Sequence, residues 1–274
     1  MRPRWLHVAL WTAGLLSAAR PSFGWHTDEQ RITDETAYTL PEGRVRLGLW
    51  KVQWTPWSPL LIGTHTFPWA VLAPNAHLKL KPLHVDPVAL AVQAGYLRLD
   101  TSRLRFIDET AAAAIVTSVP IELVGSLRFG RAFTLSAGAV YTNVRVDGEL
   151  EQYAFHGAGR AAVDNLQALL TAELRFTRVT ALVVHGRYLV YQGAHGEFDI
   201  RSQPDAYTTI EAETSADVEV GPNHGYFVAA SLVFSFEHFN LKVGAGYGNV
   251  NIPSVNFMLD RRLLQPVLDL YWIF

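Results

Sequence analysis

The sequence predicts an all-β chain that closes into one antiparallel, transmembrane up-and-down β-barrel of about twelve strands. Three observations lead to this prediction. Apolar and polar residues alternate with a period of two along most of the chain, which is typical of strands with one apolar face. The amino terminus has the pattern of a secretory signal. The last ten residues form an alternating segment that ends on an aromatic residue.

The alternation is clearest in four segments, at 75–81, 166–176, 226–236 and 239–247. A soluble β-sandwich or a lipocalin-like barrel would give the same period, but its apolar face would point inward. Charged residues make up 18% of the chain, below the roughly 25% of ordinary soluble domains. The signal, the terminal aromatic residue and the aromatic girdles described below favour the membrane barrel, whose apolar face points outward.

Composition excludes several other classes. The formal net charge of -2 indicates no nucleic-acid partner. No stretch of eighteen uninterrupted apolar residues follows the signal, which argues against a helical membrane protein. Only a closed barrel then satisfies its backbone in lipid. The chain has no cysteine, and a barrel without free edges needs no disulfides.

The first 24 residues are predicted to be a signal peptide. Arg2 and Arg4 precede an apolar run at 6–19, which is too short to span a membrane as a helix. Small residues at Ser22 and Gly24 suit cleavage before residue 25, and cleavage after residue 19 is the alternative. The barrel domain is therefore predicted to occupy residues 25–274.

Counting back from Phe274, every second residue as far as Pro266 is apolar. The segment resembles the last strand of Gram-negative outer-membrane β-barrels, which carries the assembly signal; Leu270, Trp272 and Phe274 match its positions. The resemblance indicates no particular subfamily. It implies residence in the bacterial outer membrane, contact with outer-membrane lipid, and recognition by the barrel-assembly machinery.

The predicted connections alternate between tight and long, which sets the orientation of the strands. Outer-membrane barrels have short periplasmic turns and longer external loops. Long loops are predicted at 100–112, 147–164, 192–225 and 251–261. Two aromatic girdles follow: phenylalanines near the tight turns (Phe129, Phe133, Phe176, Phe236, Phe239 and Phe274) and tyrosines at the opposite strand ends (Tyr96, Tyr141, Tyr188, Tyr226 and Tyr247).

The strand count depends on two regions near the amino terminus. Ten segments after residue 43 read as strands. A strand at 60–71, interrupted by Pro68, and a short one at 35–40 bring the total to twelve. If 56–73 is instead a loop, the barrel has ten strands. Alternation within the long external loop 192–221 predicts a hairpin that projects beyond the membrane.

If the apolar face points outward, the other face lines a polar lumen. Its predicted lining residues are His77, Lys79, Lys81, Glu122, Arg128, Glu173, Arg175, His185, Arg187, Glu237, Lys242 and Asp269. One interpretation is a water-filled path whose charges set selectivity. The other is a ladder of salt bridges that fills a narrow barrel, since barrels of this size lie between filled and open ones.

The long external loop is strongly acidic. It carries Glu197, Asp199, Asp205, Glu211, Glu213, Asp217 and Glu219 against a single cation, Arg201. It is interpreted as a solvated outer loop, the alternatives being a cation-attracting mouth or divalent-ion binding. The spacing is not that of an EF-hand, and no metal or cofactor is predicted.

The leading functional hypothesis is a passive, porin-like channel for small hydrophilic solutes. A lipid-modifying enzyme is the second, with His65, His156, His195 and His224 as the only candidate bases. No Gly-x-Ser-x-Gly or His-Glu-x-x-His pattern supports it. A structural or adhesive role through the acidic loop is the third.

Overall fold

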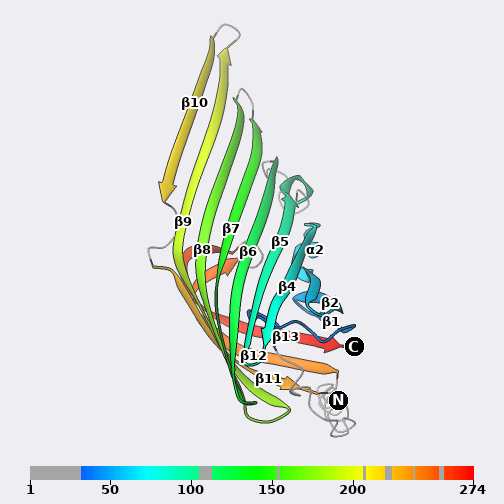
Figure 1. Cartoon of the computed structure of the whole chain (residues 1–274). Coiled ribbons are helices and arrows are strands. Elements are labelled where there is room, and N and C mark those ends of the chain that lie inside the picture. The colour runs from blue at the N-terminus through cyan, green and yellow to red at the C-terminus, as the bar shows by residue number, and fades with distance from the viewer. Residues whose placement is uncertain are drawn as a thin grey trace, which may run out of the picture.

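The computed structural model describes residues 32–104, 113–152, 155–205, 208–219, 224–236, 238–252 and 256–274. The predicted signal peptide and Glu237 lie outside these ranges. The described chain is almost wholly antiparallel β-structure (Figure 1). No helix in this part of the chain is long and apolar enough to cross a membrane.

The elements follow one another with few interruptions. They are β1 (Val45–Gly48), β2 (Lys51–Trp57), β3 (Leu60–His65), α2 (Thr66–Ala70), β4 (Asn75–Val85), β5 (Val88–Asp100), η1 (Thr101–Leu104), β6 (Ala113–Phe129), β7 (Phe133–Gln152), β8 (Phe155–Arg175), β9 (Thr180–Asp205), β10 (Thr208–Glu219), β11 (Tyr226–Ser235), β12 (Phe239–Ile252) and β13 (Phe257–Ile273).

Twelve of these strands close a barrel, which confirms the predicted fold and strand number. Each strand pairs with its neighbour in sequence, and β13 returns to pair with β1. The strand β10 stays outside the ring. The long strand β9 pairs with β8 along one edge, and along the other with β11 near the turns and with β10 further out.

The barrel is apolar outside and polar inside. On β4, Asn75, His77 and Lys79 are buried, whereas the intervening Leu78 and Leu80 are exposed. A soluble β-protein would bury the leucines and expose the lysine. The outward alternation predicted for a transmembrane strand is therefore observed, and it matches the lipid-facing pattern of membrane barrels.

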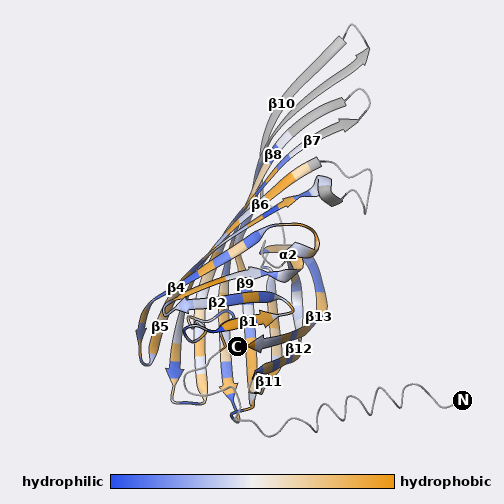
Figure 2. Ribbon diagram, turned by 90° about the vertical axis from the view of Figure 1, so that its right-hand side faces the viewer, coloured by the Kyte–Doolittle hydropathy of each residue, from blue (hydrophilic) through white to orange (hydrophobic). Residues whose placement is uncertain are grey.

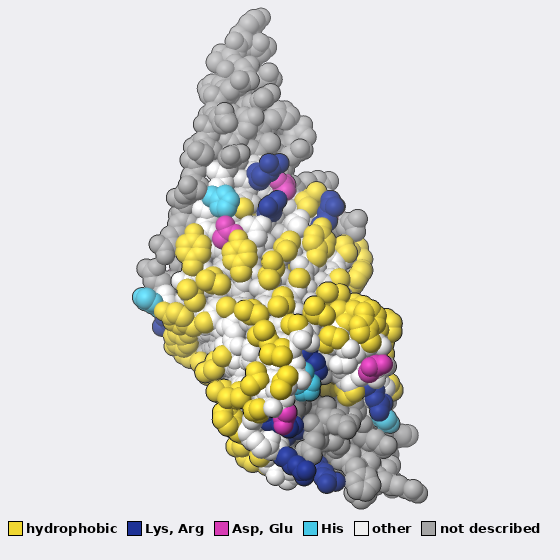
Figure 3. Space-filling view, viewed as in Figure 1, with side chains coloured by type: hydrophobic (Ala, Val, Ile, Leu, Met, Phe, Trp, Pro, Cys, Tyr) yellow, Lys and Arg dark blue, Asp and Glu magenta, His cyan; other side chains and the backbone are white. Residues whose placement is uncertain are grey.

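The apolar exterior forms a band of limited height. On β7 the outward residues are apolar from Phe133 to Tyr141, while beyond them Arg145 and Asp147 are exposed. Nine residues match the roughly nine to eleven that a tilted strand needs to cross lipid. We call the outward layer between the phenylalanine and tyrosine rows the apolar band. Hydrophobic side chains cover this level of the face in Figure 3, and charged ones gather above and below it.

The predicted external loop 147–164 is wrong as a loop, whereas the hairpin predicted within 192–221 is observed. The pairing of β7 with β8 continues to Gln152 and Phe155, far beyond the apolar band. The predicted hairpin is formed by β9 and β10 (Figure 1). Polar outward residues suggested loops here, but strands that have left the lipid can be polar on both faces.

The strand predicted at 35–40 is also wrong, because these residues lie inside the barrel. The strand predicted at 60–71 is present as β3 only up to His65, and α2 follows where the strand was predicted to continue (Figure 2). The alternative of a loop over 56–73 is wrong. The first three wall strands are therefore β1, β2 and β3. They have only 4, 7 and 6 residues, which leaves the wall low on this side.

Candidate functional site in the barrel lumen

The segment 32–40, which we call the plug, occupies the lumen on the side of the short turns. Most of its residues are buried. It contacts inward side chains from several strands around the ring, including β1, β4, β6 and β9. The protein's own chain therefore occupies part of the lumen at this level.

Asp34 attaches the plug to the low side of the wall. Its carboxylate is 3.0 Å from a guanidinium nitrogen of Arg46 and 3.0 Å from Nζ of Lys51. Arg46 is 2% exposed and also pairs with Asp269 at 2.6 Å. Its guanidinium lies 4.0 Å from the ring centre of Tyr271. Arg46 is thus enclosed by partners from the plug and from β13.

Glu35 attaches the plug to the opposite wall. Its carboxylate oxygens lie 2.6 Å from His185 Nδ1 and 2.6 Å from Arg187, both on β9. Burial alone would raise the pKa of each plug carboxyl. The facing cations outweigh this effect and hold the pKa of Asp34 and of Glu35 well below their ordinary values. Both carboxylates therefore stay charged at neutral pH.

Backbone groups of the plug are also bound by the wall. Nζ of Lys79 donates to the carbonyl oxygens of Thr33 at 2.8 Å and Thr36 at 2.9 Å. The backbone N–H of Ala37 donates to the hydroxyl of Ser126 at 2.8 Å. A segment without sheet partners would otherwise leave these polar groups buried and unpaired.

Inward apolar residues of the wall match apolar residues of the plug. Leu40 packs with Leu61, Tyr271 and Ile273, which are buried residues of the wall. Two further clusters complete the contact: Ala37 and Tyr38 with Ala89, Ala91 and Val124, and Ile32 with Val183 and Val233. The plug thus buries apolar wall residues that would otherwise face an aqueous lumen.

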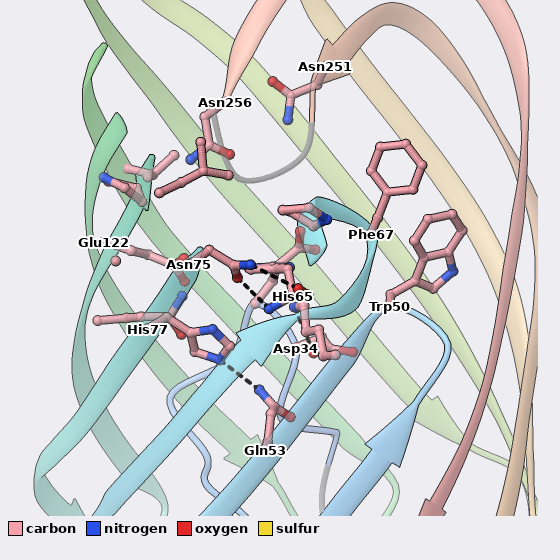
Figure 4. A pocket seen from close by; sticks show the side chains of 18 of the residues that line it. Asp34, Trp50, Gln53, His65, Phe67, Asn75, His77, Glu122, Asn251 and Asn256 are labelled. Atoms are coloured by element: carbon pink, nitrogen blue, oxygen red, sulfur yellow. Dashed lines mark hydrogen bonds and ion pairs between the residues drawn. The ribbon is translucent and has the colours of Figure 1, made fainter. Parts of the chain in front are cut away.

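A cavity of about 350 Å³ lies against the plug, whose Thr33, Asp34 and Glu35 form part of its lining. Its other polar residues include Gln53, His65, Asn75, His77, Gln93, Glu122, His185 and Arg187 (Figure 4). The volume is at the lower end of the range for small-molecule sites.

Several polar groups of the cavity have no bonding partner within the described chain. Nε2 of His77 forms a hydrogen bond with the amide nitrogen of Gln53 at 3.3 Å, but the buried Nδ1 of His77 is unpaired. Nε2 of Gln265 is also buried and unpaired. No hydrogen bond or ion pair joins Glu122 to a described residue, although the charge of Lys79 acts on it. These are groups that a bound molecule can satisfy.

Asn256, which directly precedes β13, lines the cavity and contacts the opposite wall. The amide of Asn256 accepts from Arg187 at 3.0 Å and donates to the Thr142 hydroxyl at 3.2 Å. Gln167 donates to its backbone carbonyl. The plug and Asn256 therefore both occupy the lumen beside the cavity.

The structure distributes the predicted lumen residues among different roles. His77, Glu122, His185 and Arg187 line the cavity, and Lys79 and Asp269 hold the plug or its anchor. Glu173 pairs with Arg175 at 2.6 Å, and Arg128 pairs with Asp86 at 2.6 Å near a turn. Lys81 and Lys242 are half-buried.

Sequence reasoning missed the plug carboxylates and four of their neighbours. These are Asp34, Glu35, Arg46, Lys51, Gln53 and Asn256. The available signal was the set of apolar residues at inward positions, such as Ile273. In a water-filled lumen such residues have no function, so they indicate that something apolar covers them.

The enzyme hypothesis gains no catalytic arrangement. His195 lies 3.8 Å from Asp164, and His224 contacts the hydroxyl of Tyr188 at 2.8 Å. Among the described residues, no serine or threonine hydroxyl bonds to His195 or His224. The described histidines, aspartates and glutamates form no group of three or more that could hold a metal ion. His65 lines the cavity with its ring centre 5.1 Å from that of His77, and the side chain of His156 is outside the description.

The acidic residues of 192–221 lie on the β9–β10 hairpin, where strand register places Asp199 opposite Glu213 and Asp217 opposite His195. Most of their side chains lie outside the described part of the structure. At the carboxy terminus, Trp272 and Phe274 point outward and Leu270 is half-buried. Phe274 stacks on His238 with ring centres 6.2 Å apart. Their role in assembly remains a prediction.

No protein-family model and no curated protein matches the chain. Three solved barrels resemble it. The outer-membrane expressed OmpT of Vibrio cholerae is 14% identical (TM-score 0.40), with 81% of this chain covering 62% of that one. The translocator domain of the autotransporter NalP from Neisseria meningitidis is 9% identical (TM-score 0.36), with 84% of this chain covering 85% of that one. The CymD monoaromatic hydrocarbon channel is 7% identical (TM-score 0.34), with 85% of this chain covering 88% of that one. These likenesses are too distant to inform function, and the barrel assignment rests on the strand pairing above.

Proposed function

We propose that this chain is a bacterial outer-membrane barrel that passes small molecules, and that its own plug controls their passage. The apolar band supports residence in lipid, because its height and its aromatic borders suit a membrane. The polar lumen supports passage of molecules with hydrogen-bonding groups.

The observation that carries the proposal is that the plug borders a polar cavity and is attached to the wall through ion pairs at Asp34 and Glu35. Asp34 and Glu35 each face two cationic or potentially cationic side chains of the wall. Breaking one partner of a buried ion pair is costly, so the closed state is stable until these contacts are exchanged. Passage therefore requires displacement of the plug, unlike passage through a permanently open porin.

Conductance in planar bilayers tests the proposal. The wild-type barrel should conduct weakly, and the double variant Asp34→Asn/Glu35→Gln should conduct at least tenfold more, because both attachments lose their charge. Asp147→Asn is the matched control, since Asp147 pairs with Arg160 outside the apolar band. Liposome swelling with small sugars should follow the same order.

Two results would contradict the proposal. One is a wide, constant conductance in the wild-type barrel. The other is a folded double variant that conducts no better than wild type or than Asp147→Asn.

Partner binding through the β9–β10 hairpin is a second candidate function. β10 has no partner on its outer edge within the described sheet, and an unpaired edge can accept a strand from another protein. Deleting 194–218 should then abolish attachment of cells to a surface or to other cells, while conductance is unchanged. Unchanged attachment would remove this candidate.

A further inference from the structure

The barrel wall has a gap between β13 and the low side. The pairing of β1 with β13 ends where Gly48 faces Tyr271, and one further bond joins the N–H of Leu49 to the carbonyl of Leu270. The strand β13 begins at Phe257 and remains paired with β12. Within the described chain, the part of β13 before Leu270 has no strand beside it on the β1 side.

The gap lies within the apolar band. Leu264 on β13 faces Tyr247 of the tyrosine row, and Trp272 faces Phe239 of the phenylalanine row. The edge between Leu264 and Leu268 is therefore at the depth of the lipid. In a membrane, unpaired backbone groups at this depth are costly unless they are capped or removed.

Two residues reduce that cost. The backbone of Leu270 and of Phe274 forms hydrogen bonds with the β1 side. Every second residue counted back from them along β13 therefore directs its N–H and C=O to the open edge. Pro266 has this parity, and it has no N–H to leave unpaired. The indole N–H of Trp50 donates to the carbonyl of Leu268. The edge is thus adapted to remain without a neighbouring strand.

The interior cavity reaches this gap. Trp50, Phe67 and Gln265 line the same cavity as the buried His77. Phe67 is 64% exposed, so the cavity is not sealed where Phe67 lines it. Figure 4 shows Trp50 and Phe67 together at one edge of the cavity, away from His77 and Gln53.

We propose that the gap is a lateral portal through which a small neutral amphiphile exchanges between the membrane and the cavity. The proposal rests on the proposed function and adds the substrate class. The portal is apolar, which suits a molecule dissolved in lipid. The interior offers unpaired hydrogen-bonding atoms on His77 and Gln265. Its charges face opposite charges: Lys51 pairs with Asp34, Arg187 pairs with Glu35, and the charge of Lys79 acts on Glu122. A neutral polar group therefore fits best.

A labelling experiment with a matched control tests the portal. The chain has no cysteine, so Leu264→Cys can be modified with a bulky maleimide at the portal. Leu170→Cys is the control. Both leucines are exposed, at 75% and 54%, and they lie in one row across the sheet, in which Leu170, Gly186, Val228, Tyr247 and Leu264 face one another in turn.

The probe is 1-naphthol added to barrels in lipid nanodiscs, with its binding followed by stopped-flow quenching of tryptophan fluorescence. The adduct at residue 264 should slow binding at least tenfold and leave the equilibrium affinity unchanged. The adduct at residue 170 should change neither. His77→Ala should lower the affinity without slowing entry.

Equal rates for the two adducts would overturn the portal, as would an absence of naphthol binding or displacement of naphthol by glucose at millimolar concentration. These outcomes are independent of the conductance experiment. A barrel that conducts on plug release but fails the naphthol test retains the proposed function and loses the portal.

Discussion

The two sides of the barrel differ in height and in what their inner faces do. The tall wall, β5 to β9, consists of strands of 13 to 26 residues that pair without a break around the ring. The low side, β1 to β3, has strands of 4 to 7 residues and supplies Arg46 and Lys51, which hold the plug. The comparison indicates that strand pairing holds the tall wall together, while the low side relies on buried ion pairs of Arg46 and Lys51 that also attach one end of the plug, and it borders the proposed portal.

The largest expected effect comes from Arg46 on the low side. Arg46→Met leaves Asp34 and Asp269 buried without their shared cation, which we expect to cost about 3–5 kcal/mol in the free energy of unfolding. Urea unfolding of the barrel in lipid measures it. Arg160→Met on the tall wall removes an exposed pair and should cost about 0–1 kcal/mol. Similar losses in the two variants would contradict the assigned difference between the two sides.

Proline substitution compares the open edge with the closed wall. Leu264→Pro removes an N–H that points into the gap, so the free energy of unfolding should fall by less than about 1 kcal/mol, whereas Leu170→Pro breaks a ladder hydrogen bond and should cost about 3 kcal/mol or more. The same unfolding assay applies. A cost at residue 264 as large as that at residue 170 would show that the edge is paired.

Acid should weaken the attachment of the plug. We expect this effect to be smaller than the effects of the substitutions above. Asp34 faces Arg46, Lys51 and Lys242, and Glu35 faces His185 and Arg187. Because the pKa of each carboxyl is lowered in the folded state, its contribution is complete above the ordinary values of 3.8 and 4.5. That contribution disappears as pH falls through the lowered pKa values.

Conductance of the wild-type barrel should therefore rise below about pH 4, and the Asp34→Asn/Glu35→Gln variant should show no such rise. Opening on a change from pH 5 to pH 8 instead would contradict the assignment of these carboxylates as the attachment.

The sequence predicted the fold class and strand number because lipid imposes a simple rule on outward residues. Leu78, Leu80 and Trp272 point outward as the alternation required. The rule ends where the lipid ends. Residues 147–164 therefore looked like a loop although they are paired strands.

The plug could not be identified by alternation, because 35–40 alternates like a strand and its partners are distant in sequence. Glu35 and Arg187, which meet at 2.6 Å, are separated by 152 positions. The gap was equally hidden, since alternation shows which way a residue faces and not how far a neighbouring strand extends. Pro266 was the one local sign of an open edge.

Thiol accessibility tests the central claim, that the amino-terminal segment closes the lumen, most directly. Ala37, in the plug, is fully buried against the wall, while Glu42, just beyond the plug, is exposed. In the cysteine-free chain, Ala37→Cys should react with a water-soluble maleimide at least a hundredfold more slowly than Glu42→Cys, and the two should react equally in urea. Equal rates in the folded barrel would show that the lumen is open.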